Sequence, residues 1–323
     1  MHAARPKLLI AESSGFSPAA LARLEQSFEV TPADLARADL LDILRQEQFA
    51  GLWVRLRNRI DAEVLTAAPT LQFVATNTTG LTHLDLEELE RRNIAVLSLR
   101  GEVDFLTEIR ATAEHTIALL LALLRKIPAA HEHVLAGGWD RDLFAGRELH
   151  RKTAGIIGYG RLGRIVARYL QAFGMQVLAT SPHLQQADCD PGVTAMPLQK
   201  LLAAAQIVSL HANYIPANTK LLGPAEFALM QPGSWFINTA RGELVDEARL
   251  IEALTTGHLL GAGLDVFGEE PLPRGNPLLG LANAVFAPHI AWLTPEPLVR
   301  SLSVAHENCR RLVAGEALLH QVV

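Results

Sequence analysis

The chain has 323 residues, is 49% hydrophobic and 20% charged, and carries a net charge of -5. A chain of this length can form two domains with a core each, and the composition is typical of globular proteins. The acidic balance argues against a general nucleic-acid binder, because such proteins use a basic excess to displace counterions.

Cysteine content and hydropathy indicate the compartment. Cys189 and Cys309 are too few for a disulfide framework and are typical of a reducing environment. Residues 1–7 lack the apolar stretch of a signal peptide, and the longest apolar run, Ile117–Leu124, is too short to span a bilayer. We therefore expect a cytoplasmic protein without a membrane or nucleic-acid partner.

Residues 1–99 alternate between strand and helix patterns, which predicts a small parallel α/β unit. Ser17 before Pro18 is the expected start signal of the first helix. The other predicted helices include Asp61–Ala68 and Leu84–Arg92, and the predicted strands are Lys7–Ala11, Gly51–Leu56, Leu71–Ala75 and Ile94–Leu97.

Two loops of this unit follow predicted strands. The loop Asn77–Leu81 lies at the carboxyl end of a strand, where open α/β sheets bind ligands. Arg55, Arg57 and Arg59 follow another strand. These arginines either contribute to a ligand site or form a solvated charged loop, and the sequence leaves both interpretations open.

A long helix is predicted over Thr107–Leu124, continuing past Pro128 to Ala136, where glycines end it. Such a helix suits a crossing between two domains. Its apolar part, Ile117–Leu124, fits either a dimer interface or an intramolecular core.

The central motif of the chain is a glycine-rich turn between a predicted strand, Ala154–Ile157, and a predicted helix, Arg161–Phe173. Gly158, Gly160 and Gly163 form the pattern G-x-G-x-x-G. In this pattern the first glycine allows a tight turn, the second lets the backbone approach a diphosphate, and the third lets helix and strand pack closely. The strand–turn–helix context predicts a dinucleotide site.

Two arginines support this prediction. Arg161 and Arg164 lie in the first turn of the predicted helix, where cations oppose the helix dipole. A bound anion at the helix N-terminus would remove that penalty. The alternative is a plain glycine turn with solvated arginines.

Further strands follow, and a last helix is predicted from Thr294, its cap, to about Ala314. The predicted strands are Gln176–Ala179, Ile207–Leu210, Trp235–Asn238, Gly263–Phe267 and Ala284–Ala287.

Three polar residues, Arg241, Glu270 and His289, lie just beyond successive strand ends of this second part. Arginine offers a planar fork for a carboxylate, and histidine exchanges a proton near neutral pH. A neighbouring carboxylate orients the histidine and favours its charged form. Each residue alone could be an ordinary surface residue, and His211 at another strand end is a competing histidine. Together the three predict a catalytic site.

Over nearly its whole length the chain resembles the D-isomer-specific 2-hydroxyacid dehydrogenases. Besides the glycine motif, the segments that carry the resemblance are Thr79–Asp85, Ala113–His115, Asn238–Asp246, Gly263–Phe267, Glu269–Pro273 and Pro288–Ile290.

The resemblance implies roles for individual residues. Arg241, Glu270 and His289 match the catalytic arginine, glutamate and histidine, and the amides of Thr79 and Gly80 match the loop that holds the substrate carboxylate. His211 matches a strand-end histidine near the cofactor, so the resemblance does not assign it the acid–base role. Asp265 matches an aspartate near the nicotinamide carboxamide, and the expected cofactor contacts are Gly158, Gly160, Arg161, Leu162, Gly163, Ser181, Thr239, Ala240 and Asp265.

The resemblance also implies the fold class, which is α/β with two doubly wound parallel-sheet domains. A Rossmann dinucleotide-binding domain, residues 100–290, is expected to be inserted into a flavodoxin-like substrate domain, residues 1–99 and 291–323. Family members are usually dimers through the cofactor domain, so we expect a homodimer.

The expected function is hydride transfer between NAD(P)H and a small 2-oxo or 2-hydroxy acid, with His289 as acid/base. The family usually has an aspartate after the second strand of the cofactor domain, but this chain reads Leu178–Pro182 with Ser181 there, so NAD and NADP both stay open. Asn213 stands where proline is frequent. The alternatives are a non-catalytic dinucleotide sensor, like the C-terminal-binding corepressors, and formate dehydrogenase, which has glutamine in place of Glu270.

Overall fold

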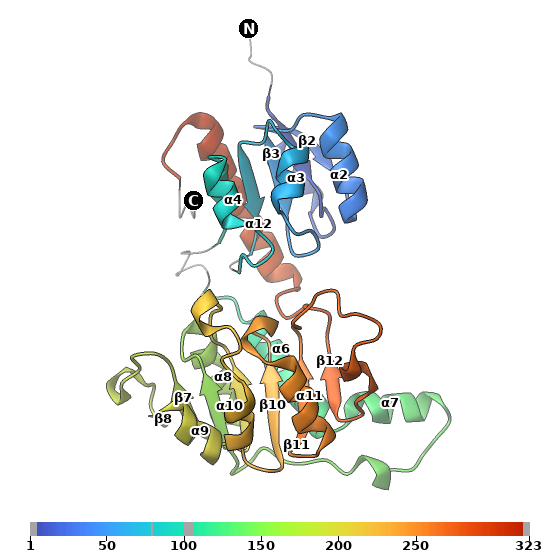
Figure 1. Ribbon diagram of the computed structural model, residues 1–323, viewed down its shortest axis with the longest axis vertical. Helices are drawn as coiled ribbons and strands as arrows, with labels where there is room; N and C mark the ends of the chain where they lie inside the picture. Colours follow the sequence, from blue (N-terminus) through green and yellow to red (C-terminus); the bar gives the residue numbers. More distant parts are fainter. Residues whose placement is uncertain (1–4, 79, 100–105, 107, 319–323) are drawn as a thin grey trace. The chain divides into compact units, whose positions relative to one another are not determined.

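The computed structural model describes residues 5–78, 80–99, 106 and 108–318. The chain forms two compact units, each an α/β structure around a parallel sheet (Figure 1). Unit 1 comprises Met1–Ile109 and Leu293–Val323, and unit 2 comprises Arg110–Trp292. The boundaries therefore lie at 109/110 and 292/293, where the sequence suggested 99/100 and 290/291.

The sheet of unit 1 is wholly parallel and has the strand order β2-β1-β3-β4-β5. This is the flavodoxin-like doubly wound order that the sequence predicted. Its strands are β1 (Lys7–Ile10), β2 (Glu29–Pro32), β3 (Gly51–Val54), β4 (Phe73–Thr76) and β5 (Ala95–Leu97). Its helices are α1 (Pro18–Leu24), α2 (Arg37–Gln46), α3 (Ala62–Ala67), α4 (Leu86–Arg91) and α12 (Pro295–Ala314).

β2 and α2 carry weak sequence signals and were not among the predicted elements. β2 is an edge strand without a fully buried residue, and it ends at Pro32, a residue that sheets accept at their edges. α2 follows Ala36, whose side chain cannot cap a helix. By contrast, the predicted cap Ser17 does accept a hydrogen bond from the Ala20 amide at 3.2 Å.

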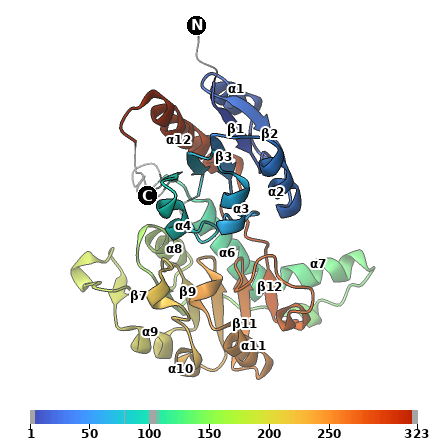
Figure 2. The ribbon, with the colours of Figure 1, turned by 45° about the horizontal axis from the view of Figure 1, so that its top comes forward.

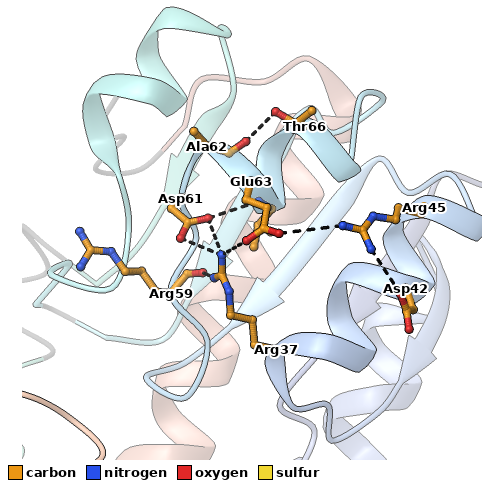
Figure 3. A network of polar contacts seen from close by, with 9 residues as sticks. Arg37, Asp42, Arg45, Arg59, Asp61, Ala62, Glu63 and Thr66 are labelled. Carbon is orange, nitrogen blue, oxygen red and sulfur yellow. Dashed lines mark hydrogen bonds and ion pairs between the residues drawn. The ribbon is translucent and has the colours of Figure 1, made fainter.

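α2 and α3 are joined by ion pairs on the surface of unit 1 (Figure 3). Arg37 donates to Asp61 at 2.9 Å and to Glu63 at 2.6 Å, and these hydrogen bonds raise the pKa of Arg37. Asp61 also caps α3 by accepting from the Val64 amide. Because the pairs are partly exposed, each contributes only about 0–1 kcal/mol.

α12 belongs to unit 1 although the whole of unit 2 separates it in sequence from the other elements of that unit. It lies beside α1 and packs on β4 and β5 (Figure 2). Its buried side chains Leu302, Ala305 and Cys309 join a core that contains Trp53 and Phe73. α12 thereby completes the cover of a sheet face that α1 alone covers only in part.

The sheet of unit 2 is also parallel, with the order β12-β11-β10-β9-β6-β7-β8. Counted from β6, the six strands β6 to β11 have the Rossmann order 3-2-1-4-5-6, as the resemblance implied, and β12 adds a seventh strand beside β11. The strands are β6 (Thr153–Ile157), β7 (Gln176–Thr180), β8 (Val193–Ala195), β9 (Ile207–Leu210), β10 (Ser234–Asn238), β11 (Leu259–Leu264) and β12 (Ala284–Phe286). The helices are α6 (Ala111–Leu124), α7 (Ile127–Leu135), α8 (Arg161–Ala172), α9 (Leu198–Ala204), α10 (Pro224–Leu229) and α11 (Glu247–Thr255).

Two predicted elements of unit 2 were placed wrongly. α6 begins at Ala111, since residues 108–110 are not helical, and the predicted start at Thr107 lies outside the described residues. β11 was predicted at Gly263–Phe267 but spans Leu259–Leu264, so Asp265 lies just beyond it.

Glycines explain the error in β11, because they usually weaken a strand pattern. A Cβ at Gly261 would lie 2.6 Å from the Asn283 carbonyl oxygen and 2.9 Å from Leu123 Cδ1 of α6. One at Gly263 would lie 2.9 Å from Ile237 Cδ1 of β10 and 3.3 Å from Leu119 Cβ of α6. The glycines therefore allow α6 to pack closely on β11.

Within the described part of the chain, none of the helices combines the length and the apolar character that a bilayer crossing requires.

Candidate active site

The glycine turn of unit 2 leaves room for a ligand. Gly158 has φ of +96°, and a Cβ there would lie 2.4 Å from the Ala212 amide. A Cβ at Gly163 would lie 2.2 Å from the Gly158 carbonyl oxygen. Around Gly160, in contrast, a Cβ would meet no atom within 4 Å. The outer glycines are thus required by the protein itself, whereas Gly160 leaves open space at the start of α8.

The N-terminus of α8 has the properties of an anion site. Gly160 is its N-cap and provides no side-chain cap, and the first turn, which includes Arg161 and Leu162, has no acidic residue. The backbone N–H groups and the helix dipole therefore favour an anion there. Burial lowers the pKa of Arg161, with the charge of Arg110 as a second cause. These residues fit the diphosphate of a dinucleotide.

Arg164 does not point to that site. Its guanidinium lies over the Tyr159 ring at 4.6 Å, is 3.5 Å from the Asp190 carboxylate, and donates to the Asp188 carbonyl at 2.7 Å. The Tyr159 hydroxyl donates to Asp190 at 2.9 Å, and burial is the largest cause that raises the pKa of Tyr159 to about 12. The charge of Arg164 is therefore balanced within the protein, contrary to the expectation from the sequence.

The loop after β7 is tied to the glycine turn. The Tyr159 amide donates to Ser181 Oγ at 2.6 Å. This bond holds Ser181 beside the turn and leaves its hydroxyl proton for another acceptor. His183, two residues later, is exposed and has a left-handed backbone with φ of +67°.

The turn after β10 carries Arg241. The Ala240 amide donates to Asn238 Oδ1 at 2.9 Å, and Asn238 Nδ2 donates to the Arg241 carbonyl at 3.0 Å. Thr239 Oγ1 lies 2.8 Å from Thr116 Oγ1 of α6. Since the Thr116 hydroxyl donates to the Thr112 carbonyl, Thr239 is the donor in this bond.

Gly242 brings this turn against the segment after β11. A Cβ at Gly242 would lie 1.8 Å from the Phe267 carbonyl oxygen, so only glycine fits. Burial lowers the pKa of Arg241, while the charges of Glu243, Glu270 and Asp265 oppose this effect. Arg241 therefore stays a cation in an environment with little water, and its charge is close enough to Glu270 to interact with it.

Glu270 and His289 form a direct pair. His289 Nδ1 lies 2.6 Å from Glu270 Oε2, and Glu270 Oε1 accepts from the Phe267 amide at 3.0 Å. Burial raises the pKa of Glu270, but the hydrogen bond and charge of His289, the Phe267 amide and the charge of Arg241 together bring it below its usual value. Glu270 is therefore ionised at neutral pH, and the ring is held through Nδ1.

The carboxylate of Asp265 holds the segment that contains His289. It is fully buried, and its oxygens accept from the amides of Ile290 at 2.8 Å and Ala291 at 2.9 Å. The Asp265 carbonyl accepts from the His289 amide at 2.9 Å. His289 itself has φ of +56°, a conformation that is unusual for a residue other than glycine.

His211, the competing histidine, is bonded elsewhere. Its Nε2 lies 2.8 Å from Ser209 Oγ, and burial lowers its pKa to about 4. A ring that is neutral at physiological pH cannot serve as the proton donor in a reduction. The expectation that His211 is not the acid/base stays a prediction.

In unit 1 the loop after β4 is partly described. The Thr78 hydroxyl donates to the Gly80 carbonyl at 2.9 Å, and Thr79 lies outside the described residues. Of the arginines after β3, Arg55 donates to the Ser14 carbonyl at 3.2 Å and Arg57 lies 3.7 Å from Asp34. The Arg59 side chain points away from the Arg37 cluster (Figure 3).

Two contacts of α6 escaped the sequence analysis. Besides the bond of Thr116, His115 Nε2 lies 3.3 Å from Asp265 Oδ1. Ala113–His115 was noticed only as part of a family motif. A signal was present, since the adjacent polar residues Glu114, His115 and Thr116 interrupt a helix that is apolar from Ile117 to Leu124.

The chain is similar to known proteins over most of its length. The family model "D-isomer specific 2-hydroxyacid dehydrogenase, NAD binding domain" matches residues 117–291. D-3-phosphoglycerate dehydrogenase of Mycobacterium tuberculosis is 38% identical over 312 residues, which cover 96% of this chain and 57% of that protein. The chain thus spans little more than half the length of this relative.

Two further proteins are similar to this chain over almost the whole length of both sequences. Glyoxylate reductase of Korarchaeum cryptofilum is 35% identical over 303 residues, covering 92% of this chain and 90% of that protein. The crystal structure of D-lactate dehydrogenase from Aquifex aeolicus, complexed with NAD and lactic acid, has a TM-score of 0.82 at 27% identity and covers 96% of each chain.

Proposed function

The chain belongs to the D-isomer specific 2-hydroxyacid dehydrogenase family, and from this membership we propose that it transfers a hydride between NAD(P)H and a small 2-oxo or 2-hydroxy acid, with D stereochemistry. The observation that carries the proposal is the bond between His289 and the ionised Glu270, in the same unit as Arg241 and the glycine turn.

The residues act as follows in the reducing direction. Bound NAD(P)H supplies the hydride. Glu270 holds His289 through Nδ1, so Nε2 is the nitrogen that protonates the carbonyl oxygen of the substrate. Arg241 binds the substrate carboxylate with its planar fork, and the amides of Thr79 and Gly80 share this task. Fixing the carboxylate keeps the carbonyl carbon in reach of the hydride.

The cofactor contacts come from three segments of unit 2. The turn around Gly160 binds the diphosphate, and Ser181 binds the ribose next to the adenine. Thr239, Ala240 and Asp265 lie at the nicotinamide end. The full proposed set is Gly158, Gly160, Arg161, Leu162, Gly163, Ser181, Thr239, Ala240 and Asp265.

We propose that the enzyme uses both NADH and NADPH. Ser181 can donate to a ribose hydroxyl or to a 2′-phosphate, and it repels neither. Arg164 of α8 is 3.5 Å from the Asp190 carboxylate, so its charge is already balanced and is not free for a phosphate. Neither cofactor is therefore strongly selected.

An assay of cofactor oxidation with a panel of 2-oxo acids tests the proposal. The panel contains glyoxylate, pyruvate, hydroxypyruvate and 3-phosphohydroxypyruvate, each with NADH and NADPH, and chiral chromatography identifies the product. Consumption of cofactor with a D product supports the proposal. No turnover with any acid, or an L product, contradicts it.

The panel also separates two substrate classes that the relatives represent. The related phosphoglycerate dehydrogenase acts on a phosphorylated acid, and Arg59 is a cation that could bind a phosphate in unit 1. The buried indole nitrogen of Trp292 has no hydrogen-bond partner among the described residues, so a polar substrate group could satisfy it. Arg59→Ala should impair only a phosphorylated substrate, whereas Trp292→Phe should impair small polar acids.

We further propose a homodimer that is formed through unit 2. Large apolar side chains are exposed on α7 and the segment after it, including Leu135 at 74% and Trp139 at 88%. An apolar hollow of about 390 Å³ lies between α6 and α8, lined by Ile117, Ala118, Leu121, Tyr169, Ala172 and Phe173. Monomers rarely expose surfaces of this kind. Light scattering should give twice the chain mass, and Leu135→Asp with Trp139→Asp should give a monomer, while Leu229→Asp on α10 should not.

The cytoplasm is the proposed location. Both cysteines are free thiols, and Cys309 is fully buried in the core of unit 1, as is typical of proteins from a reducing compartment. Fractionation of cells that express the native protein tests this assignment.

A further inference from the structure

One turn of α6 contacts the turn that carries Arg241 and the carboxylate that holds the segment of His289. Thr116 accepts the hydrogen bond of Thr239, which precedes Arg241 by two residues. The adjacent His115 places Nε2 3.3 Å from Oδ1 of Asp265, whose carbonyl accepts the amide of His289. The proposed chemistry uses neither His115 nor Thr116.

The buried position of the Asp265 carboxylate is energetically costly. A fully buried carboxylate is unfavourable unless hydrogen bonds or opposite charges compensate for its lost hydration. Its hydrogen bonds come from the amides of Ile290 and Ala291, which belong to the segment that it positions. His115 is a compensating group from a separate element, a helix that packs on β10, β11 and β12.

The contact of His115 is specific to Asp265. The Nε2 atom is buried and makes no hydrogen bond to the described residues, so the carboxylate at 3.3 Å is the polar group that it faces. The held segment needs support because the left-handed backbone of His289 is unfavourable for a side chain with a Cβ. A shift of Asp265 would release this backbone and the ring that Glu270 orients.

We propose that His115 is a positioning residue that acts on His289 through Asp265. It keeps the buried carboxylate in place, and the carboxylate keeps the 289–291 backbone in the conformation that presents the acid/base. The inference rests on the proposed function. His115 itself touches neither substrate nor the reacting atoms in this assignment.

A double-mutant cycle tests the coupling. His115→Leu should lower kcat about tenfold, the size of effect that neighbouring coupled residues show, with little change in the KM of the 2-oxo acid. In an Asp265→Asn background the same substitution should change kcat by less than about twofold, because the charge it acts on is gone. Independent, multiplying losses would overturn the proposal.

Two further variants separate positioning from packing. His115→Gln keeps a side-chain N–H donor and should restore kcat to within about threefold of the parent. If glutamine were as damaging as leucine at an unchanged melting temperature, the ring and not the contact with Asp265 would matter, and the proposal would fail. His150→Leu, at an exposed histidine that precedes β6 and lies outside α7, is the control and should behave like the parent.

Amide hydrogen exchange gives a readout that needs no turnover. In His115→Leu the amides of Ile290 and Ala291 should exchange faster than in the parent, while peptides from α8 stay unchanged. Equal exchange at these two amides would overturn the proposal. If the parent reduces no 2-oxo acid, the proposed function fails, but the exchange experiment still decides whether His115 holds this segment.

Discussion

Replacement of Glu270 by glutamine tests the electrostatic link on which the proposed proton transfer depends. Glu270 Oε2 lies 2.6 Å from His289 Nδ1, and a hydrogen bond to a charged group contributes about 1.5–3 kcal/mol. The exposed fractions of the two side chains are 34% for Glu270 and 21% for His289, so solvent weakens the interaction and the lower end applies. At 1.36 kcal/mol per tenfold change in rate, loss of this interaction should lower kcat/KM at neutral pH about tenfold.

The charge of Glu270 also sets the direction in which the pH dependence of the rate should move. Its lowered pKa keeps it ionised at neutral pH, where it favours the protonated ring. Reduction needs that protonated form, so the rate is high at low pH and falls as the pH rises. Glutamine removes the charge, so the fall in kcat/KM should begin at a lower pH than in the parent.

The assay is kcat/KM for reduction of the preferred 2-oxo acid over the neutral pH range. Glu269→Gln is a matched control, because this neighbouring carboxylate is exposed. An unchanged midpoint in a Glu270→Gln protein that melts like the parent would refute the reasoning.

Four further substitutions have defined outcomes. His289→Asn should lower kcat by about 10²–10⁴-fold with nearly unchanged NADH affinity by fluorescence titration, and activity within about threefold of the parent would remove it as acid/base. Arg241→Lys should lower kcat/KM for the 2-oxo acid about 10–100-fold, because a point charge cannot replace the fork; an effect on NADH affinity alone would make it a cofactor ligand. Ser181→Asp should move the kcat/KM ratio of NADH and NADPH towards NADH, because the new carboxylate repels the 2′-phosphate. A parent that already prefers NADH about a thousandfold, which is roughly 4 kcal/mol, would show that another residue rejects the phosphate. Gly242→Ala should lower the melting temperature, since a clash of this kind costs about 1–3 kcal/mol, whereas Gly275→Ala, where a Cβ meets open space, should not.

The parts of the fold that the sequence predicted are those with local signals. The glycine turn was recognisable because Gly158 and Gly163 stand between an apolar strand and an amphipathic helix. Glu270 and His289 could be placed together because the ends of parallel strands meet at one edge of a sheet. Such arguments need only the order of strands and the residues that follow them.

The parts that could not be predicted depend on contacts between distant segments. Nothing near Arg164 in the sequence shows that Asp190 balances its charge. The glycines of β11 weakened its strand pattern, although their lack of a side chain makes room for α6 and the neighbouring segments. His115 could be identified as a group facing Asp265 only when helix and strand were seen packed together.

The division of unit 1 into two segments has a consequence for synthesis on the ribosome. Its core includes Leu302, Ala305 and Cys309 together with Trp53 and Phe73, so this core stays incomplete until the last helix has been translated. Unit 2, residues 110–292, is translated in full before that helix. Since domains generally fold as units during translation, unit 2 can complete its fold before unit 1 does. The segment of unit 1 that precedes unit 2 therefore keeps part of an apolar sheet face uncovered until α12 has been translated.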